Sequence, residues 1–402
     1  DFLWGYILII LLIGAGLLFS FKTKFVQFRY IKEMFRLLGD GIGKSNKEKG
    51  GVSSFQAFCI STASRVGTGN IAGVAIAVAV GGPGAVFWMW LIALIGSASS
   101  FVESTLAQIY KTKDKDSFRG GPAYYMEKGL GKRWLGIIFS ILITICFGFV
   151  FNAVQANTVS VAFNSAFGLS RGAIGIILAI VTALVIFGGI HRVAKVSEII
   201  VPILAVLYIL IAIIVLILNI TEIPSVFKLI FESAFGIKQL TAGGLGAAVM
   251  QGIKRGLFSN EAGMGSAPNA AATADVTHPV KQGLIQTLGV FTDTLLICSC
   301  TAFIILLSGQ YADSSLTGIE LTQKALVSQI GPFGAYFIAI CILLFAFSSI
   351  VGNFYYGQTN IEFIHTNKVL LNIYRILVIG MVLFGSIAKV DLVWNLADLF
   401  MG

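Results

Sequence analysis

Charged residues are scarce in this chain of 402 residues: only 12% are charged, whereas 56% are hydrophobic. Soluble domains carry about 25% charged residues, so a soluble fold with a solvated surface is excluded. The mean hydropathy of +0.89 instead predicts a polytopic membrane protein. The net charge of +9 does not indicate nucleic-acid binding, because the positive residues lie in loops between apolar runs, where membrane orientation explains them.

Cysteine and histidine are also few. The five cysteines all lie in apolar runs, where small buried residues are expected, and Cys298 and Cys300 have no companion pair that would complete a metal site. The three histidines, His191, His278 and His365, are far apart in the sequence. Neither residue type predicts a metal centre, and no nucleophile with a neighbouring base is evident. An enzyme is therefore not expected.

The chain begins with an apolar run, Trp4–Phe21, whose basic residues follow it rather than precede it. This order is not that of a secretory signal, and no small-residue cleavage site is evident. We expect an extra N-terminal transmembrane helix over residues 1–22, with its N-terminus outside the cell. A basic connector of residues 23–50 follows, in which the aromatic and cationic residues of Phe25–Leu38 predict an interfacial helix.

Further apolar runs predict the other membrane helices. They lie over Ser53–Val80, Ala85–Tyr110, Trp134–Ala166, Gly172–Ile190, Val196–Asn219, Thr241–Ala274, Gly283–Leu307, Gly334–Phe363 and Val369–Ala388, with a last helix beginning near Leu392. Eight lysines and arginines lie between Lys22 and Gly50 and seven in the loop Lys111–Arg133, whereas only five lie in the loops on the opposite side. This bias places both basic loops in the cytoplasm and predicts a multi-pass protein of the cell membrane.

Residues 61–73, with the sequence STASRVGTGNIAG, interrupt the first of these runs. Gly67 and Gly69 each weaken a helix by roughly 0.5–1 kcal/mol relative to alanine. A helix that opens in hydrocarbon strands its backbone polar groups unless they line a cavity. Freed N–H groups suit a carboxylate and freed carbonyls suit a cation, which is the arrangement of transporters with discontinuous helices. A glycine-rich helix–helix contact is the plainer alternative.

A second interruption, LFSNEAGMGS at residues 257–266, lies in the run Thr241–Ala274. Corresponding breaks in two halves predict two inverted five-helix repeats, over residues 51–220 and 241–402, with an extracellular segment at 221–240 between them. The hydropathy pattern and the breaks alone support this prediction, because the halves share no convincing sequence identity. The last helix of the second repeat is expected to be incomplete.

Three stretches resemble the alanine/glycine:cation symporter family: GTGNIAG at 67–73, GGPGAVFWMWLIALIG at 81–96 and SNEAGMGSAP at 259–268. The resemblance extends from the first helix to Trp394. It implies the amino-acid–polyamine–cation superfamily, an all-α leucine-transporter-type fold with core helices 1 and 6 broken, and sodium-coupled uptake of alanine or glycine by alternating access. A proton-coupled transporter of the same fold is the alternative. A channel is less expected, because it needs a continuous polar lining.

The fold implied by this resemblance holds a sodium ion between the first broken helix and the eighth core helix. Its expected ligands in this chain are the carbonyls of Ala63, Val66 and Phe345 and the hydroxyls of Ser348 and Ser349. Carbonyl and hydroxyl oxygens, without a carboxylate among them, suit a monovalent ion that must also be released from its site. Serines that bond back to their own helix are the plainer alternative. Na⁺ is thus the expected coupling ion, and no organic cofactor is expected.

The substrate is expected between the two breaks. Its carboxylate would meet the amides of the first break and its ammonium the carbonyls of the second. A polar stripe in an apolar helix adds Gln155, for which helix–helix bonding is the alternative. The expected substrate-binding residues are Gly67, Thr68, Gly69, Asn70, Gln155, Phe258, Ser259 and Asn260.

Buried charges complete the prediction. Arg65 should have a partner within the membrane, with Glu103, Glu261 and Asp293 as the available carboxylates, or it binds the substrate carboxylate directly. Asp293 or Glu261 is an alternative proton or cation relay, and Asn70 is a candidate for a second cation site. The expected partners are a small amino acid and the lipid bilayer. Alanine, glycine and serine are not separated by the sequence, nor are L- and D-isomers.

Overall fold

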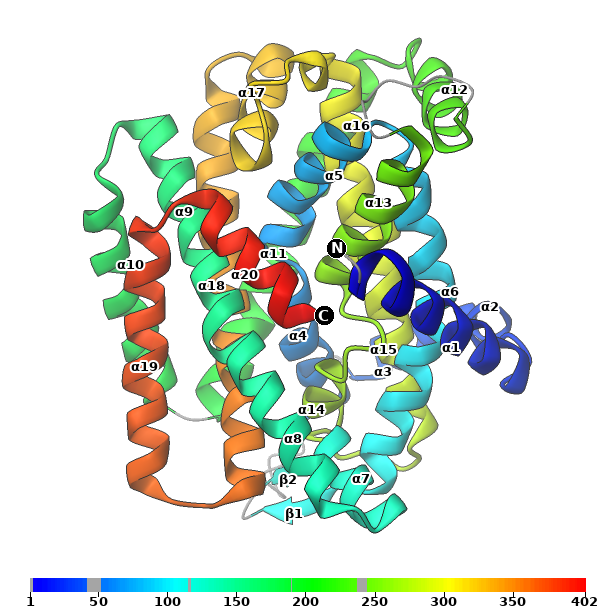
Figure 1. Cartoon of the computed structure of the whole chain (residues 1–402), viewed down its shortest axis with the longest axis vertical. Coiled ribbons are helices and arrows are strands. Elements are labelled where there is room, and N and C mark those ends of the chain that lie inside the picture. Colours follow the sequence, from blue (N-terminus) through cyan, green and yellow to red (C-terminus); the bar gives the residue numbers. More distant parts are fainter. Residues whose placement is uncertain (1–2, 42–51, 115–116, 189, 237–243) are drawn as a thin grey trace.

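The computed structural model describes residues 3–41, 52–114, 117–188, 190–236 and 244–402. Over these ranges the chain is helical apart from connecting turns and one two-stranded hairpin. Six helical segments there are long and apolar enough to cross a membrane, and two further helices, bent by 48° at a break, make a seventh if they are counted as one span. Most helices run along the longest axis of the molecule (Figure 1). The predicted polytopic, helical membrane protein is confirmed.

The elements of the first half are η1 (Leu3–Leu8), α1 (Ile9–Lys22), α2 (Val26–Arg29), α3 (Ile31–Gly41), α4 (Ser54–Arg65), η2 (Gly69–Gly73), α5 (Val74–Gly81), α6 (Ala85–Ile109), β1 (Thr112–Asp114), β2 (Ser117–Arg119), α7 (Pro122–Leu130), α8 (Arg133–Ile143), η3 (Thr144–Phe151), α9 (Asn152–Phe167), α10 (Arg171–Ile186) and α11 (Ile190–Leu218). Those of the second half are α12 (Ile223–Ala234), α13 (Gly244–Asn260), α14 (Ala267–Ala271), α15 (Val280–Phe291), η4 (Thr292–Cys298), α16 (Ser299–Ser308), η5 (Gln310–Ala312), α17 (Gly318–Ile330), α18 (Phe333–Ile364), α19 (Lys368–Ile387) and α20 (Val390–Met401).

The N-terminal elements form an arm beside α6. In Figure 1 the N-terminus lies at about mid-height of the bundle, and α1 leads from there to the right-hand edge. The predicted interfacial helix corresponds to α2 and α3: Met34 and Leu37 pack on Phe58 of α4, whereas Phe35 remains 61% exposed. The rest of the connector, residues 42–50, lies outside the described residues. A transmembrane N-terminal helix with its N-terminus outside stays a prediction.

Both predicted helix interruptions are present. Helix α4 begins at a capping box formed by Ser53 and Gln56 and ends at Arg65, where Val66 becomes extended (φ −78°, ψ 93°). In the second interruption, α13 ends at Asn260 and α14 begins only at Ala267. Helices α4 and α14 occupy the lower half of the bundle and α5 and α13 the upper half (Figure 1). The two breaks therefore lie near mid-height. The inverted repeats stay a prediction.

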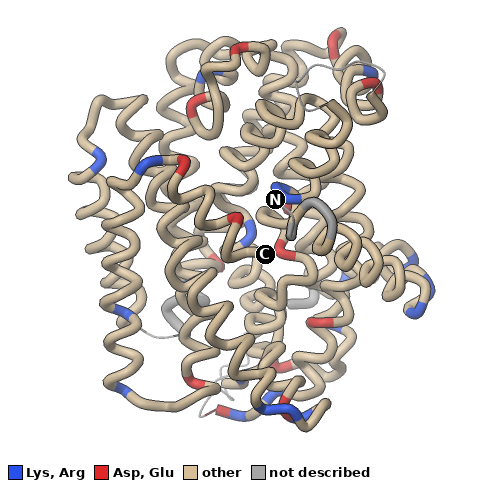
Figure 2. Tube along the Cα trace, viewed as in Figure 1, with Lys and Arg blue, Asp and Glu red and all other residues tan. Residues whose placement is uncertain are grey.

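One end of the bundle carries the basic loop Lys111–Arg133, and we call it the basic face. Figure 2 marks charged positions at the ends of the helices, including this lower end, and others near mid-height of the bundle. The strands β1 and β2 pair antiparallel here, within the loop Lys111–Arg133. This hairpin was not predicted, because a short pair of polar strands has no hydrophobic alternation to reveal it.

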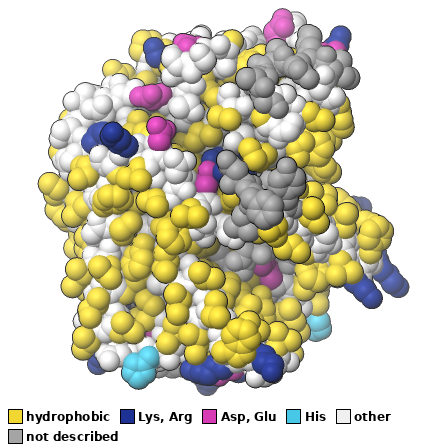
Figure 3. Space-filling model, viewed as in Figure 1, with side chains coloured by type: hydrophobic (Ala, Val, Ile, Leu, Met, Phe, Trp, Pro, Cys, Tyr) yellow, Lys and Arg dark blue, Asp and Glu magenta, His cyan; other side chains and the backbone are white. Residues whose placement is uncertain are grey.

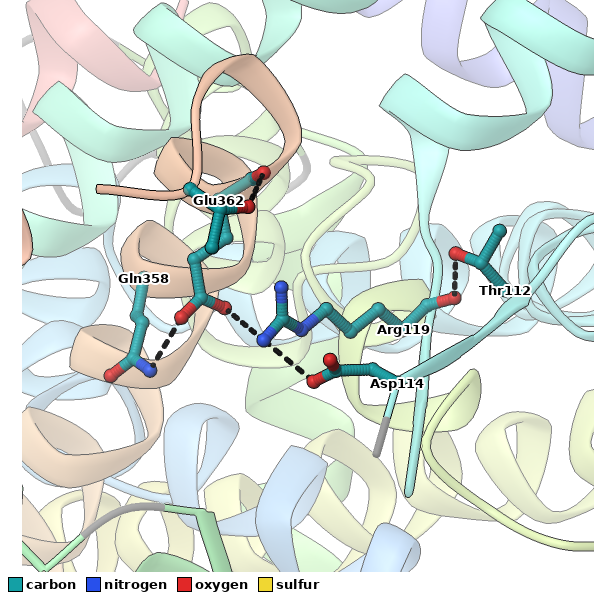
Figure 4. Close-up of polar contacts among 6 residues, drawn as sticks. Thr112, Asp114, Arg119, Gln358 and Glu362 are labelled. Atoms are coloured by element: carbon teal, nitrogen blue, oxygen red, sulfur yellow. Dashed lines mark hydrogen bonds and ion pairs between the residues drawn. The ribbon is translucent and has the colours of Figure 1, made fainter. Parts of the chain in front are cut away.

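A polar network ties the hairpin to the end of α18 (Figure 4). The Arg119 guanidinium lies 2.6 Å from the Asp114 carboxylate and 3.2 Å from that of Glu362, which also accepts a hydrogen bond from Gln358 at 3.1 Å. Lys111 donates to the carbonyl of Ala274 at 2.7 Å, just beyond α14. The ends of α6, α14 and α18 are thus joined at the basic face.

Candidate functional site

Three backbone carbonyls converge on one hydroxyl beside the first break. The Ser349 Oγ atom lies 2.9 Å from the carbonyl oxygen of Ala63, 3.4 Å from that of Val66 and 3.1 Å from that of Phe345. The first two carbonyls belong to the broken helix and the third to α18. All four residues are buried, at 1% exposure or less. Four of the five predicted sodium ligands are therefore brought together.

This arrangement has more acceptors than donors. A serine hydroxyl carries one proton, so it can satisfy only one of the three carbonyls at a time. The chain direction explains why the carbonyls of Ala63 and Val66 are available: α4 ends at Arg65, so they lose the N–H partners that a continued helix would supply, whereas Phe345 lies inside α18. Converging carbonyl oxygens in a buried site suit a monovalent cation.

The fifth predicted ligand, Ser348, has a different contact. Its hydroxyl donates to the carbonyl of Phe345 at 2.8 Å, three residues back in the same helix. This is the plainer alternative, a serine bonded to its own helix. Because Ser348 shares the Phe345 carbonyl with Ser349, it borders the carbonyl cluster without joining its two helices.

The N–H groups of the first break are bound by side-chain oxygens. Gln155 Oε1, from α9, accepts from the Thr68 backbone N–H at 3.0 Å and from the Thr68 hydroxyl at 2.6 Å. Asn70 Oδ1 accepts from the Gly67 N–H at 2.9 Å. Gln155 therefore faces the break, as predicted, and its carboxamide oxygen occupies donors that suit a carboxylate.

Glycine is required at residues 67 and 69 by close packing. A Cβ atom on Gly67 would collide with Ser349 Oγ and lie 3.0 Å from Gln155 Oε1. One on Gly69 would lie 2.9 Å from the Ser259 Cα atom of the second break. The two breaks are thus in direct contact, and the glycines allow it.

A polar network joins the breaks to η4. Asn70 donates through Nδ2 to the Asp293 carboxylate at 2.7 Å, and Ser259 donates to the other oxygen of that carboxylate at 2.8 Å. Asp293 lies in a π-helical turn, a feature often found at functional sites. The sequence marked Asn70 as a candidate for a second cation site without its partners. The structure places Asp293 and Ser259 beside it.

The two remaining predicted residues of the second break, Phe258 and Asn260, have different contacts. The Phe258 ring lies 4.6 Å from that of Phe151 and 5.0 Å from that of Trp394, between ring centroids. Asn260 uses its side chain within the break: Oδ1 accepts from the Ala262 N–H at 3.0 Å and Nδ2 donates to Thr294 at 3.1 Å. Its side chain is thus engaged in holding the break open.

Arg65 is fully buried, but the expected direct ion pair is absent among the described residues. Its guanidinium donates to the Gln286 carbonyl at 3.2 Å and to Ser100 at 3.3 Å. These contacts direct it toward α15 and α6, while Glu103, Glu261 and Asp293 are bound by other donors. Arg65 still acts on all three carboxylates electrostatically.

Glu103 and Glu261 both hold the second break. Glu103, from α6, accepts from the N–H groups of Gly263 at 3.3 Å and Gly265 at 3.1 Å. Glu261 lies within the break at a left-handed φ of 56°, which is unusual for a residue other than glycine. Its carboxylate accepts from Ser64 at 2.7 Å and Ser266 at 2.5 Å. Neither role follows from sequence spacing.

A cavity of about 290 Å³ lies on the side of the bundle remote from the basic face, between α9, α17 and α20. Arg171, Glu320 and Asp391 contribute its charged lining, and Thr158 and Trp394 are among its buried residues. Figure 3 shows acidic and basic side chains gathered at the upper left of a largely apolar face. Because Trp394 also contacts Phe258, one aromatic layer separates this cavity from the second break.

Sequence reasoning missed three participants. Trp394 was used only to mark how far the resemblance extends, because nothing in the last helix shows which face packs inward. Cys298 was taken as a small buried residue, yet its Sγ lies 3.4 Å from Asn70 Nδ2 and 3.2 Å from Ser259 Oγ. Asn353 was overlooked, although its position four residues after Ser349 puts both on one face of α18.

Comparisons with known proteins identify the family of this chain. The model of the sodium:alanine symporter family matches residues 1–402. The chain is 60% identical to the probable sodium/glutamine symporter GlnT of Bacillus subtilis and 59% identical to its amino-acid carrier protein AlsT, covering 100% of this chain and 84% and 85% of those proteins. It is 39% identical to the sodium/alanine symporter AgcS of Methanococcus maripaludis, over 100% of this chain and 90% of that protein. These relatives are named as transporters rather than enzymes. The chain belongs to the sodium:alanine symporter family.

Proposed function

We propose that this protein carries a small neutral amino acid, alanine or glycine, into the cell together with sodium. The observation that supports this most is the convergence of the Ala63, Val66 and Phe345 carbonyls on Ser349, at the point where the first helix breaks. A cation held there contacts both the broken helix and α18. It is therefore placed to hold these two elements together.

The amino acid would lie between the two breaks. Its carboxylate takes the N–H donors of Gly67 and Thr68, which Asn70 and Gln155 contact in this structure. Its ammonium takes carbonyls of the second break near Phe258 and Ser259. The close approach of Gly69 to Ser259 leaves little room between the breaks, which favours a small side chain.

Alternating access gives the route. We propose a leucine-transporter-type arrangement, with the basic face in the cytoplasm because positively charged loops favour that side. The cavity beside Trp394 then opens outward, and the Phe258–Trp394 contact separates it from the amino acid. At the basic face, the Arg119–Glu362 pair and its neighbours close the opposite exit.

The test is binding of alanine to the purified protein, titrated at several sodium concentrations with potassium as the control. We expect the apparent affinity for alanine to rise with sodium and not with potassium, because two ligands that favour each other must do so reciprocally. No effect of sodium over a wide range would remove the sodium site. A dependence on pH instead would favour proton coupling.

The cargo is tested by competition. The 60% identity to a probable sodium/glutamine symporter makes glutamine the second candidate. Sodium-stimulated alanine uptake should be inhibited by excess glycine and much less by glutamine. Stronger inhibition by glutamine than by glycine would show that the space between the breaks widens on binding, and glutamine would replace alanine in this proposal.

A further inference from the structure

A second group of oxygen atoms lies one helical turn from the proposed sodium site, toward the basic face. Ser64, Glu261, Ser266 and Asn353 form it, and we call it the Glu261 cluster. Asn353 follows Ser349 by four residues in α18, so the two side chains lie on one face, about 6 Å apart along the helix axis. Helix α18 ends at the basic face, where Glu362 contacts Arg119 (Figures 1 and 4).

The cluster is short of protons. Ser64 Oγ lies 2.7 Å from Glu261 Oε1 and 2.6 Å from Asn353 Oδ1, but a hydroxyl has one proton to donate. The Asn353 Nδ2 atom is buried without a partner. In this orientation, one buried polar atom of Asn353 is therefore left unsatisfied beside Ser64.

A third buried group points to the same place. The Tyr356 hydroxyl, one turn further along the same face of α18, interacts with both Ser64 and Glu261. Ser64, Glu261, Ser266, Asn353 and Tyr356 are all at most 4% exposed. Unsatisfied buried polar groups are costly, so the unpartnered Asn353 Nδ2 atom beside a carboxylate indicates a ligand.

The charge around the breaks identifies the kind of ligand. Arg65 is one positive charge, whereas Glu103, Glu261 and Asp293 are three carboxylates, and Arg65 interacts with each of them. A buried carboxylate without a compensating positive charge takes up either a cation or a proton. Carboxylate, hydroxyl and amide oxygens are ligands for a hard cation rather than for an anion or an apolar molecule.

We infer that the Glu261 cluster is a second, transient site for the coupling cation, occupied as the cation leaves the Ser349 site for the basic face. This inference rests on the proposed function, and it adds a release step to it. The Glu261 carboxylate attracts the cation more strongly than the three neutral carbonyls of the Ser349 site do. Ser64 links the two sites because it directly follows Ala63 in α4. Glu261 does not hold the cation during substrate binding.

The experiment compares net flux with exchange for the full chain in proteoliposomes. Net alanine uptake into sodium-free vesicles requires sodium release in every cycle, whereas alanine exchange with saturating sodium on both sides does not. For Glu261→Gln we expect net uptake to fall at least tenfold more than exchange does, with the sodium concentration for half-maximal exchange unchanged. Asn353→Ala should shift the same ratio in the same direction.

Thr182→Val is the matched control, because Thr182 of α10 is also a fully buried hydroxyl without a partner, away from both breaks. It should leave the ratio of net uptake to exchange unchanged. If Glu261→Gln does not fold, Asn353→Ala alone decides. Equal loss of net uptake and exchange in these variants would make the cluster a structural support, and no loss would also overturn the inference.

Two other outcomes are distinguishable. If wild-type net uptake follows a proton gradient, and Glu261→Gln abolishes that response, the cluster carries protons and the cation site is refuted. If the wild-type protein shows no sodium-driven alanine flux, the proposed function itself fails and this inference falls with it. Normal sodium-driven flux in both wild type and Glu261→Gln refutes this inference alone.

Discussion

Replacing Ser349 by alanine tests the proposed sodium site at its centre. The Ser349 hydroxyl is the only side-chain oxygen predicted as a ligand that contacts carbonyls of both the broken helix and α18. A hydrogen bond or ligand contact to a charged group is worth about 1.5–3 kcal/mol. Since 1.4 kcal/mol corresponds to a factor of ten, Ser349→Ala should raise the sodium concentration for half-maximal alanine uptake roughly 10- to 100-fold.

Ser348→Ala is the matched control. It removes a hydroxyl of equal size from the adjacent residue, but that hydroxyl bonds only to its own helix, at Phe345. The loss of a neutral hydrogen bond costs about 0.5–1.5 kcal/mol of stability, and the sodium dependence of uptake should be nearly unchanged. The assay is alanine uptake into proteoliposomes over a range of sodium concentrations at constant ionic strength.

The two variants give a clear refutation. An unchanged sodium dependence in Ser349→Ala would show that the convergence of carbonyls is structural, as would a larger effect of Ser348→Ala. A loss of folding is separated from a loss of binding by the melting temperature of each purified variant. If a chain that carries both Ser348→Ala and Ser349→Ala keeps its sodium stimulation and its melting temperature, the ion site lies elsewhere.

Three further variants test the surrounding structure. Gly67→Ala places a methyl group against Ser349 Oγ and 3.0 Å from Gln155 Oε1, so it should abolish sodium-driven uptake. Gly73→Ala is the control and should leave uptake intact, because the nearest neighbours of its new methyl group are 3.8 Å away. Asp398→Asn leaves the buried cations Lys254 and Arg255 without their carboxylate and should destabilise the fold by about 3–5 kcal/mol, seen as a lower melting temperature. An unchanged melting temperature would show that these two ion pairs do not stabilise the fold. Arg119→Gln removes the cation that contacts Glu362 at the basic face. In a chain that also carries Asn360→Cys, it should speed the reaction of the new thiol with a soluble thiol reagent. An unchanged rate would show that the Arg119–Glu362 pair does not close this face.

The six long membrane spans were predictable from hydropathy, whereas the predicted helices at 1–22 and Gly172–Ile190 correspond to the shorter apolar helices α1 and α10. The run Ala85–Tyr110 became α6 and Gly334–Phe363 became α18, each within a residue or so at either end. Helix α17 and the hairpin of β1 and β2 were missed. Both lie in segments expected to be loops, and the hairpin is held by ion pairs of Arg119 with residues that the sequence does not mark as neighbours.

The candidate site was predictable only in part, for a similar reason. Glycines beside polar residues in an apolar run show where a helix breaks, so the residues of both breaks were identified. Contacts between helices depend on how each helix is rotated. Asn70 and Asp293 are 223 residues apart, and no local pattern reveals their hydrogen bond. The direct ion pair expected for Arg65 was wrong because the nearest acceptors were a carbonyl and a hydroxyl of neighbouring helices.

One peptide group connects the two parts of the proposed site. The Val66 carbonyl lies beside Ser349, in the sodium site, and the Gly67 N–H, in the same planar peptide, donates to Asn70 where the substrate carboxylate is proposed to bind. A cation at the carbonyl polarises this peptide and makes its N–H a stronger donor, by about 10–30% per bond.

The same polarisation acts in reverse, because a carboxylate on the N–H makes the carbonyl a better cation ligand. A carboxylate therefore gains more from these donors when sodium is bound than neutral Asn70 and Gln155 do. This difference is a coupling free energy, of the order of 1–3 kcal/mol in known cases. Under our proposal, sodium and amino acid favour each other because the helix break gives them opposite ends of a single peptide.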